Sequence, residues 1–137
     1  YTDVPADTWY TDAVYAAREA GTMLGMSDKI FAPDAQLSRA QVAQILYNRA
    51  GRPAHSDAQA FADVDKDAWF YDAVQWAAEN GVASGMGNKK FAPNEAVTRE
   101  QLAQFIRHTG FCRCQYRFRL GNTGCHLGST ESRDFRR

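Results

Sequence analysis

Cysteine is absent from the first 110 residues of this 137-residue chain, because Cys112, Cys114 and Cys125 all lie behind them. Residues 1–110 therefore need no disulfide bond and offer no thiolate site for a metal. The chain also lacks any apolar run of the roughly 20 residues that a membrane-spanning helix needs, so we expect no membrane insertion. It begins at Tyr1 without a signal-peptide pattern, and we interpret it as a fragment or a mature piece.

Net charge is also absent, because 16 acidic residues balance 16 lysines and arginines. A protein that binds nucleic acid by neutralising phosphates usually carries excess positive charge, so we expect no nucleic-acid partner. The balance hides an asymmetry: residues 1–110 hold 14 acids and 10 bases, whereas residues 111–137 hold 2 acids and 6 arginines. The two segments therefore differ in charge as well as in cysteine content.

The sequence does contain a repeat with a period of 60 residues. Residues 1–50 and 61–110 align without a gap and share 20 identical positions. Unrelated sequences of ordinary composition match at about one position in fifteen, so this similarity is not a coincidence. Trp9 aligns with Trp69, a residue type that rarely coincides by chance.

Each copy is predicted to form two helices joined by an irregular loop. The first helix is expected over residues 10–20 and 70–80, and glycines at 21 and 81 favour its end. A Phe-Ala-Pro segment follows in each loop, where proline excludes a helix. The first helices carry small and apolar residues at helical spacing. These are Ala13, Val14 and Ala17 in one copy and Ala73, Val74 and Ala77 in the other.

The second helix of each copy begins with a capping-box pattern, Ser38 with Gln41 and Thr98 with Gln101. An apolar stripe follows at i, i+3, i+4 spacing. Its members are Val42, Ile45 and Leu46, and then Leu102, Phe105 and Ile106. Two helices cannot bury such stripes alone, so neighbouring copies are expected to share a core.

These motifs, in this order, resemble the S-layer homology family. Its modules run Phe-x-Asp-Val, Trp-(Phe/Tyr), Ala-Val, Gly-x-x-x-Gly, Phe-x-Pro and a helix start like Thr-Arg-Ala-Glu. The first copy has Tyr1–Val4, Trp9-Tyr10, Ala13-Val14, Gly21 to Gly25, Phe31–Pro33 and Ser38–Gln41. The second copy has Phe61–Val64, Trp69-Phe70, Ala73-Val74, Gly81 to Gly85, Phe91–Pro93 and Thr98–Gln101. Glutamine replaces the family's glutamate at both helix starts.

The resemblance implies an all-α fold of tandem helix-loop-helix repeats packed around a shared core, in a pseudo-threefold arrangement. The expected third module is missing, because the 60-residue frame finds none of its motifs after residue 110. We expect repeat 1 over residues 1–50, a linker over 51–60, repeat 2 over 61–109 and an atypical basic tail over 110–137. The tail is predicted to be disordered or non-native, and we hypothesise that a shifted reading frame produced it.

The resemblance also implies that grooves between modules bind secondary cell-wall polymer, commonly through a pyruvylated amino sugar. A pyruvate ketal is a carboxylate, which an arginine at a helix start binds with two donors. Tryptophan offers a face to a sugar ring, and glycine permits close approach. The predicted ligand-binding residues are Arg39, Arg99, Trp9, Trp69, Gly25 and Gly85.

Other interpretations of these residues stay open. The tryptophans can serve as core anchors alone, and the arginines can pair with surface carboxylates. Asp3 and Asp63 are expected to cap backbone amides of their turn. Methionines at 26 and 86 are interpreted as core residues. The sequence shows no nucleophile motif and no complete calcium or zinc spacing, so we expect no catalytic residue, cofactor or metal.

The resemblance thus implies a non-catalytic, extracellular module that anchors a surface protein to the bacterial cell wall or S-layer. One alternative is the tether of a surface enzyme whose catalytic domain lies elsewhere. Another is a structural contact in S-layer assembly. The oligomeric state is left open by the sequence.

Overall fold

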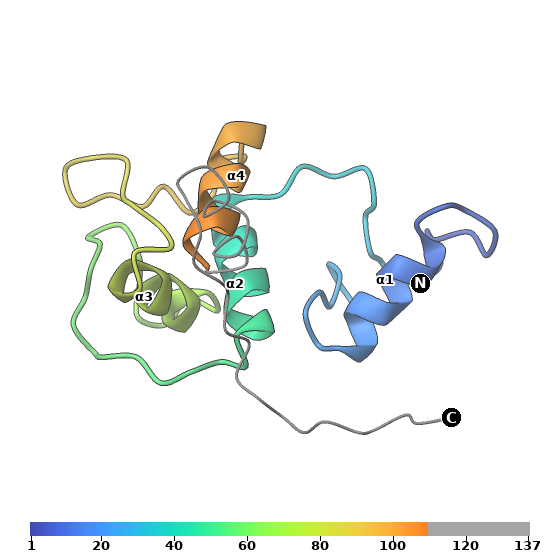
Figure 1. The fold of residues 1–137 in the computed structure, drawn as a ribbon, viewed down its shortest axis with the longest axis horizontal. Helices are drawn as coiled ribbons and strands as arrows, with labels where there is room; N and C mark the ends of the chain where they lie inside the picture. The colour runs from blue at the N-terminus through green and yellow to red at the C-terminus, as the bar shows by residue number, and fades with distance from the viewer. Residues whose placement is uncertain (110–137) are drawn as a thin grey trace, which may run out of the picture.

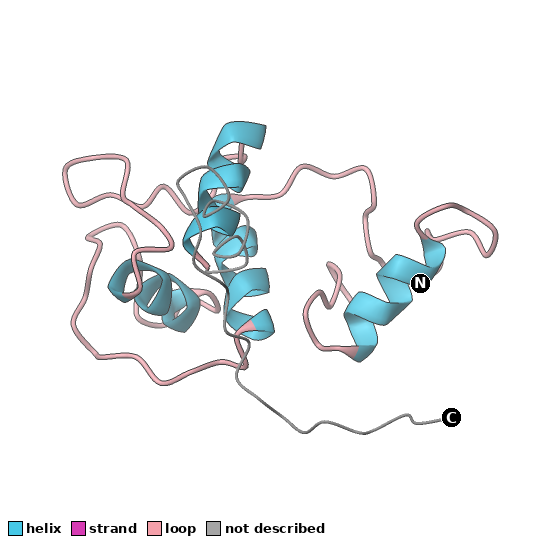
Figure 2. Ribbon diagram, in the orientation of Figure 1, coloured by secondary structure: helices cyan, strands magenta, loops and turns pink. Residues whose placement is uncertain are grey.

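The computed structural model describes residues 1–109, and this part of the chain is built from four helices and their loops (Figures 1 and 2). The helices are α1 (Thr11–Glu19), α2 (Arg39–Arg49), α3 (Tyr71–Glu79) and α4 (Arg99–His108). Among the described residues the extended structure amounts to one isolated bridge, between Ser38 and Ala96. The predicted all-α class is confirmed. The predictions for residues 110–137 lie outside the described residues.

The second helix of each repeat begins at the predicted capping box. At α2 the Ser38 hydroxyl accepts from the Gln41 amide at 3.3 Å, and the Gln41 side chain accepts from the Ser38 amide at 2.8 Å. Thr98 and Gln101 make the same pair of bonds at α4, at 3.3 and 3.1 Å. Each cap satisfies amides that have no partner inside the helix and contributes about 1 kcal/mol.

The core joins α2 of the first repeat to the whole of the second repeat. α2 packs against α3, the one helix pair of the described part in extensive contact, and Figure 1 shows α1 standing to one side. From α2 the core takes Val42, Ala43, Leu46 and Tyr47. From the second repeat it takes, among others, Phe61, Val64, Val74, Trp76, Phe91 and Phe105. The core cluster thus contains residues of both repeats.

The two repeats bury their equivalent residues unequally. Ala73, Val74 and Ala77 of α3 are all 0% exposed, because α2 covers them. In α1 the counterpart Val14 is buried, but Ala13 is exposed. Among the second helices it is the one in the first repeat that is more buried, because α2 has six buried residues and α4 has only Phe105. A second helix therefore covers the first helix of the repeat that follows it.

An aspartate early in each repeat holds the Phe-Ala-Pro segment of the same repeat. The Asp63 carboxylate accepts from the amides of Phe91 and Ala92, both at 2.8 Å. Asp3 accepts from the equivalent amides of Phe31, at 2.9 Å, and Ala32, at 2.6 Å. The aspartates cap backbone amides, but the prediction that these amides belong to the aspartate's own turn is wrong, because they lie 28 or 29 residues later.

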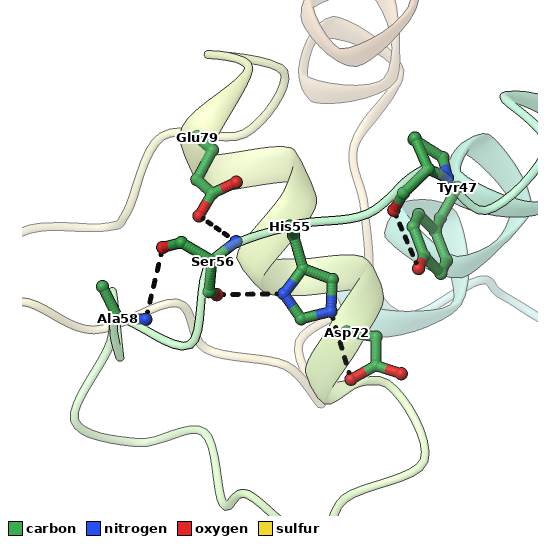
Figure 3. A network of polar contacts seen from close by, with 7 residues as sticks. Tyr47, His55, Ser56, Ala58, Asp72 and Glu79 are labelled. Atoms are coloured by element: carbon green, nitrogen blue, oxygen red, sulfur yellow. Dashed lines mark hydrogen bonds and ion pairs between the residues drawn. The ribbon is translucent and has the colours of Figure 1, made fainter.

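The segment between the repeats lies along α3 and is held there by polar contacts (Figure 3). His55 Nδ1 faces the Ser56 carbonyl oxygen at 3.0 Å, and its Nε2 faces an Asp72 carboxylate oxygen at 3.3 Å. The Ser56 amide donates to Glu79 at 2.7 Å. Nearby, the Tyr47 hydroxyl donates to the Pro53 carbonyl at 3.1 Å. These contacts fix the path of the chain from α2 to repeat 2.

The His55 contacts predict a pH-dependent term in stability. The Ser56 carbonyl is the main cause that raises the pKa of His55, burial opposes it, and Asp72 adds to the increase. A raised pKa means that the stabilisation is fully present below the unfolded value of about 6.5 and is lost as pH rises through the folded pKa. We expect His55→Gln to lower the free energy of unfolding by less than about 1 kcal/mol at pH 5.5 and by less still at pH 8.5, measured by urea unfolding.

Candidate ligand pocket at the junction of the repeats

A pocket of about 490 Å³, which we call the larger pocket, lies at the junction of the two repeats. Its walls are loop residues 22–26 and the side chains of α2 that face them, with Arg52 and Trp69 completing the rim from the linker and from repeat 2. The facing α2 residues are Gln41, Gln44, Ile45 and Asn48. A volume of this size lies within the range of about 300–1,000 Å³ typical of small-molecule sites.

The rim of this pocket combines an aromatic surface with a guanidinium group. Trp69 is 63% exposed, and its ring meets Phe70 edge-on at a centroid distance of 5.1 Å. Arg52 Nε donates to Asn48 Oδ1 at 2.9 Å, and Gln44 Nε2 donates to the same oxygen at 2.9 Å. The terminal nitrogens of Arg52 make no hydrogen bond within the described residues. They can therefore donate in pairs to a carboxylate.

Sequence reasoning missed Arg52, which it assigned to the linker. Its backbone has a φ of 53°, and it follows Gly51 at a φ of 83°, so the chain turns sharply as it leaves α2. This turn returns the side chain to Asn48 at the end of the helix. A basic residue after a glycine at a helix end is the one sequence signal that points to it.

Gly25 lies in this pocket, and the surrounding backbone explains why it is glycine. Its φ is 75°, and a Cβ atom there would lie 2.8 Å from the Ile30 carbonyl oxygen. Gly85 is equally crowded, with a Cβ position 2.8 Å from the Lys90 carbonyl oxygen and 2.8 Å from the Phe61 ring. Both glycines permit close approach by the chain's own loop, so their contact with a ligand stays a proposal.

Arg39 is placed at the contact between the repeats. It is 3% exposed, its Nε donates to the Phe91 carbonyl at 2.8 Å, and its Nη2 donates to the Ser84 carbonyl at 3.0 Å. The guanidinium lies over the rings of Phe91, at 4.8 Å, and Phe105, at 5.5 Å. Burial lowers its pKa, and the carboxylates of Glu95 and Asp63 oppose that effect. A surface ion pair, the alternative interpretation, is wrong for this arginine.

The six predicted site residues fall into three groups. Trp69 and Gly25 line the larger pocket. Arg39 and Gly85 line a second pocket of about 150 Å³. Arg99 and Trp9 are exposed and line neither pocket.

Two further interpretations are corrected by the exposed fractions. The tryptophans are not core anchors, because Trp9 is 93% and Trp69 63% exposed. Met26 and Met86 are not core residues, since they are 62% and 54% exposed. Each lies in the irregular loop of its repeat, where helical spacing gives no guide to burial.

None of the helices within residues 1–109 has the length and apolar character to cross a membrane.

The S-layer homology domain family matches this chain twice, over residues 1–43 and 60–103. The Surface-layer 125 kDa protein of Lysinibacillus sphaericus is 37% identical over 95 residues, which are 69% of this chain and 8% of that protein. An Endoglucanase of Bacillus sp. (strain KSM-635) is 34% identical over 103 residues, 75% of this chain and 11% of the enzyme. An S-layer protein of Bacillus thuringiensis subsp. finitimus is 31% identical over 107 residues, 77% of this chain and 13% of the relative. The chain thus spans a small part of each relative.

Proposed function

Because the chain belongs to the S-layer homology domain family, whose members are proteins of the bacterial cell surface, we propose that it anchors a surface protein by binding a secondary cell-wall polysaccharide. The anchoring role follows from the family and from the surface-layer relatives. The finer part of the proposal is the ligand, a pyruvylated polysaccharide, and its place, the larger pocket between the repeats. The role proposed for these repeats is non-catalytic.

One observation carries the choice of pocket: Trp69 and Arg52 lie on the rim of the same cavity. The exposed indole can stack on the apolar C–H face of a sugar ring. The guanidinium, positioned by Asn48, can bind the carboxylate of a pyruvate ketal with two parallel hydrogen bonds. Side-chain amides on α2 face the remaining space and match sugar hydroxyls.

The other predicted residues take different parts in this proposal. Arg39 holds the loop of repeat 2 against α2 and so maintains the junction at which the pocket forms. The smaller pocket at Arg39 and Gly85 is a second candidate place for ligand, but about 150 Å³ is below the usual range for such sites. Arg99 and Trp9, which the sequence predicted as contacts, line neither pocket, and the proposal gives them no contact with the ligand.

Retention of the chain on cell-wall sacculi that carry the pyruvylated polymer tests the proposal. We expect Trp69→Ala and Arg52→Ala each to weaken binding by about tenfold, which corresponds to about 1.4 kcal/mol. Trp9→Ala is the matched control, because this exposed tryptophan occupies the equivalent position in repeat 1 and lines neither pocket. Mild acid removal of the ketal from the sacculi should lower binding of the wild type but not the residual binding of Arg52→Ala. Equal retention of all three variants would contradict the assigned pocket.

The endoglucanase relative favours a second candidate, in which the anchored protein is a surface enzyme. In that case the present repeats supply attachment and a catalytic domain lies elsewhere in the longer protein. A reading frame that extends from this segment into a glycoside hydrolase domain would support it. Assembly contacts within an S-layer are the remaining proposed role, which the surface-layer relatives motivate.

A further inference from the structure

The two pockets are equivalent positions of the repeat. Residues 22–26 and Gln41, Gln44 and Ile45 line the larger pocket, and residues 82–86, Gln101, Gln104 and Phe105 line the smaller one, each 60 positions later. The difference is Arg39, which reaches into the smaller pocket from the preceding repeat. Within residues 1–109 the larger pocket receives no arginine from a preceding repeat, although Arg52 of the linker lines it, and its volume is about 490 rather than about 150 Å³. The larger pocket is therefore equivalent to the site that Arg39 enters, but no arginine of a preceding repeat fills it within residues 1–109.

The first repeat has carbonyl groups at the positions equivalent to those that bind Arg39 in the second repeat. Arg39 binds the carbonyl groups of Ser84 and Phe91. Their counterparts are the carbonyl groups of Leu24 and Phe31, and neither accepts a backbone hydrogen bond within the described residues. Leu24 is 54% exposed. Phe31 is partly exposed, whereas its counterpart Phe91 is 0% exposed. An incoming guanidinium would find two carbonyl oxygens and a ring face here.

The second repeat carries the matching arginine on an uncovered helix. Arg99 is the counterpart of Arg39, and it is exposed at the start of α4. The stripe behind it is uncovered too, since Leu102 is 36% and Ile106 38% exposed, whereas the equivalent Val42 and Leu46 of α2 are 3% and 7% exposed. On α1 the face equivalent to the covered face of α3 is also uncovered, with Ala13 exposed.

We propose that the chain self-associates head to tail, with α4 of one copy on α1 of the next and Arg99 inserted into the larger pocket. The contact reproduces between copies what α2 and Arg39 make with repeat 2 inside one chain. Each copy donates one surface and accepts a different one, so the interface is heterologous. The inference does not rest on polymer binding, although both would use the same pocket and therefore exclude each other there.

Sedimentation of the 137-residue chain without polymer, in reductant because the sequence contains three cysteines, tests the proposal. We expect the mass to rise with concentration. Arg99→Ala removes the donated side chain, and Leu24→Arg places a like charge in the pocket of the accepting copy. Each variant alone should associate at least about tenfold more weakly than the wild type, a loss of about 1.4 kcal/mol. Lys66→Ala, which removes an exposed cation that lines neither pocket, should associate as the wild type does.

Mixing the two defective variants gives the sharpest result. Arg99→Ala keeps its pocket and Leu24→Arg keeps its arginine, so the mixture should form a complex of one copy of each and grow no further. Thermal unfolding by circular dichroism shows whether both variants are folded. A wild-type chain that stays monomeric up to about 1 mM, a concentration at which only very weak association escapes detection, would overturn the proposal. A mixture of the two variants that associates no better than each variant alone would also overturn it. A monomeric wild-type chain is the result expected if the larger pocket accepts only a third repeat of a longer chain.

Discussion

Replacing Arg39 with alanine should lower the free energy of unfolding by about 3 kcal/mol, because the buried carbonyl group of Phe91 and the partly buried contact at Ser84 lose their donor. In the folded chain, Arg39 donates to Phe91 at 2.8 Å and to Ser84 at 3.0 Å while its own side chain is 3% exposed. The change also removes the contact of the guanidinium with the rings of Phe91 and Phe105. Urea unfolding followed by circular dichroism measures the loss.

Arg99→Ala is the matched control for this prediction, since the two arginines occupy the same position of the repeat and the same place after a capping box. Arg99 is exposed, so its removal from the monomer should change the free energy of unfolding by less than about 0.5 kcal/mol. Arg39→Lys should fall between wild type and Arg39→Ala, because lysine keeps the charge but lacks the planar fork that reaches two carbonyl groups. Equal losses for Arg39→Ala and Arg99→Ala would contradict the role assigned to Arg39.

The second large effect is expected at Asp63. Its carboxylate accepts from two backbone amides, and one of them belongs to Ala92, which has a left-handed φ of 57°. Asp63→Ala would leave both amides without an acceptor and would release a loop that Arg39 also contacts. We expect a loss of about 2 kcal/mol from the free energy of unfolding. Asp63→Asn keeps an acceptor oxygen of the same reach but no charge, and it should retain part of the stabilisation.

The Asp63 contribution should also depend on pH. Burial alone raises the pKa of this carboxyl, but the amides of Phe91 and Ala92 outweigh it, so the folded pKa lies below the ordinary value. For a lowered pKa the stabilisation is present above the ordinary value of 3.8 and is lost as pH falls through the folded pKa. The difference in stability between wild type and Asp63→Ala should therefore be constant above about pH 5 and shrink as the pH falls below about 4. A difference that grows in acid would contradict this account.

Much of the fold followed from local patterns in the sequence. The capping boxes at Ser38 and Thr98 set the starts of α2 and α4, because a side chain and an amide three residues apart satisfy each other without help from distant residues. The 60-residue period predicted a shared core, since an apolar stripe on a two-helix unit needs a neighbour. These inferences depend on contacts and spacings between residues close together in the chain, which can be identified in the sequence alone.

The site was harder to predict, because its residues depend on contacts between repeats. Arg39 and Arg99 look identical in the sequence, yet one is buried and one is exposed, since only Arg39 is followed by a described repeat that can receive it. Trp69 reaches the larger pocket, whereas Trp9 has no preceding repeat within residues 1–109 whose pocket it could line. The role of Arg52 depends on a sharp turn after α2 that the linker composition does not reveal. Position within the array, not residue type, separates these pairs.

The central claim is that the polymer binds at the junction of the two repeats, beside Trp69. The chain has three tryptophans, and each gives one indole N–H signal in a proton–nitrogen NMR spectrum: Trp69 at the pocket, Trp9 exposed away from it and Trp76 in the core. Titration with a pyruvylated wall-polymer fragment should shift the Trp69 signal and the amide signals of residues 22–26 while leaving the Trp9 and Trp76 indoles in place. A shift at Trp9 without one at Trp69, or saturable binding that moves neither signal, would contradict the claim.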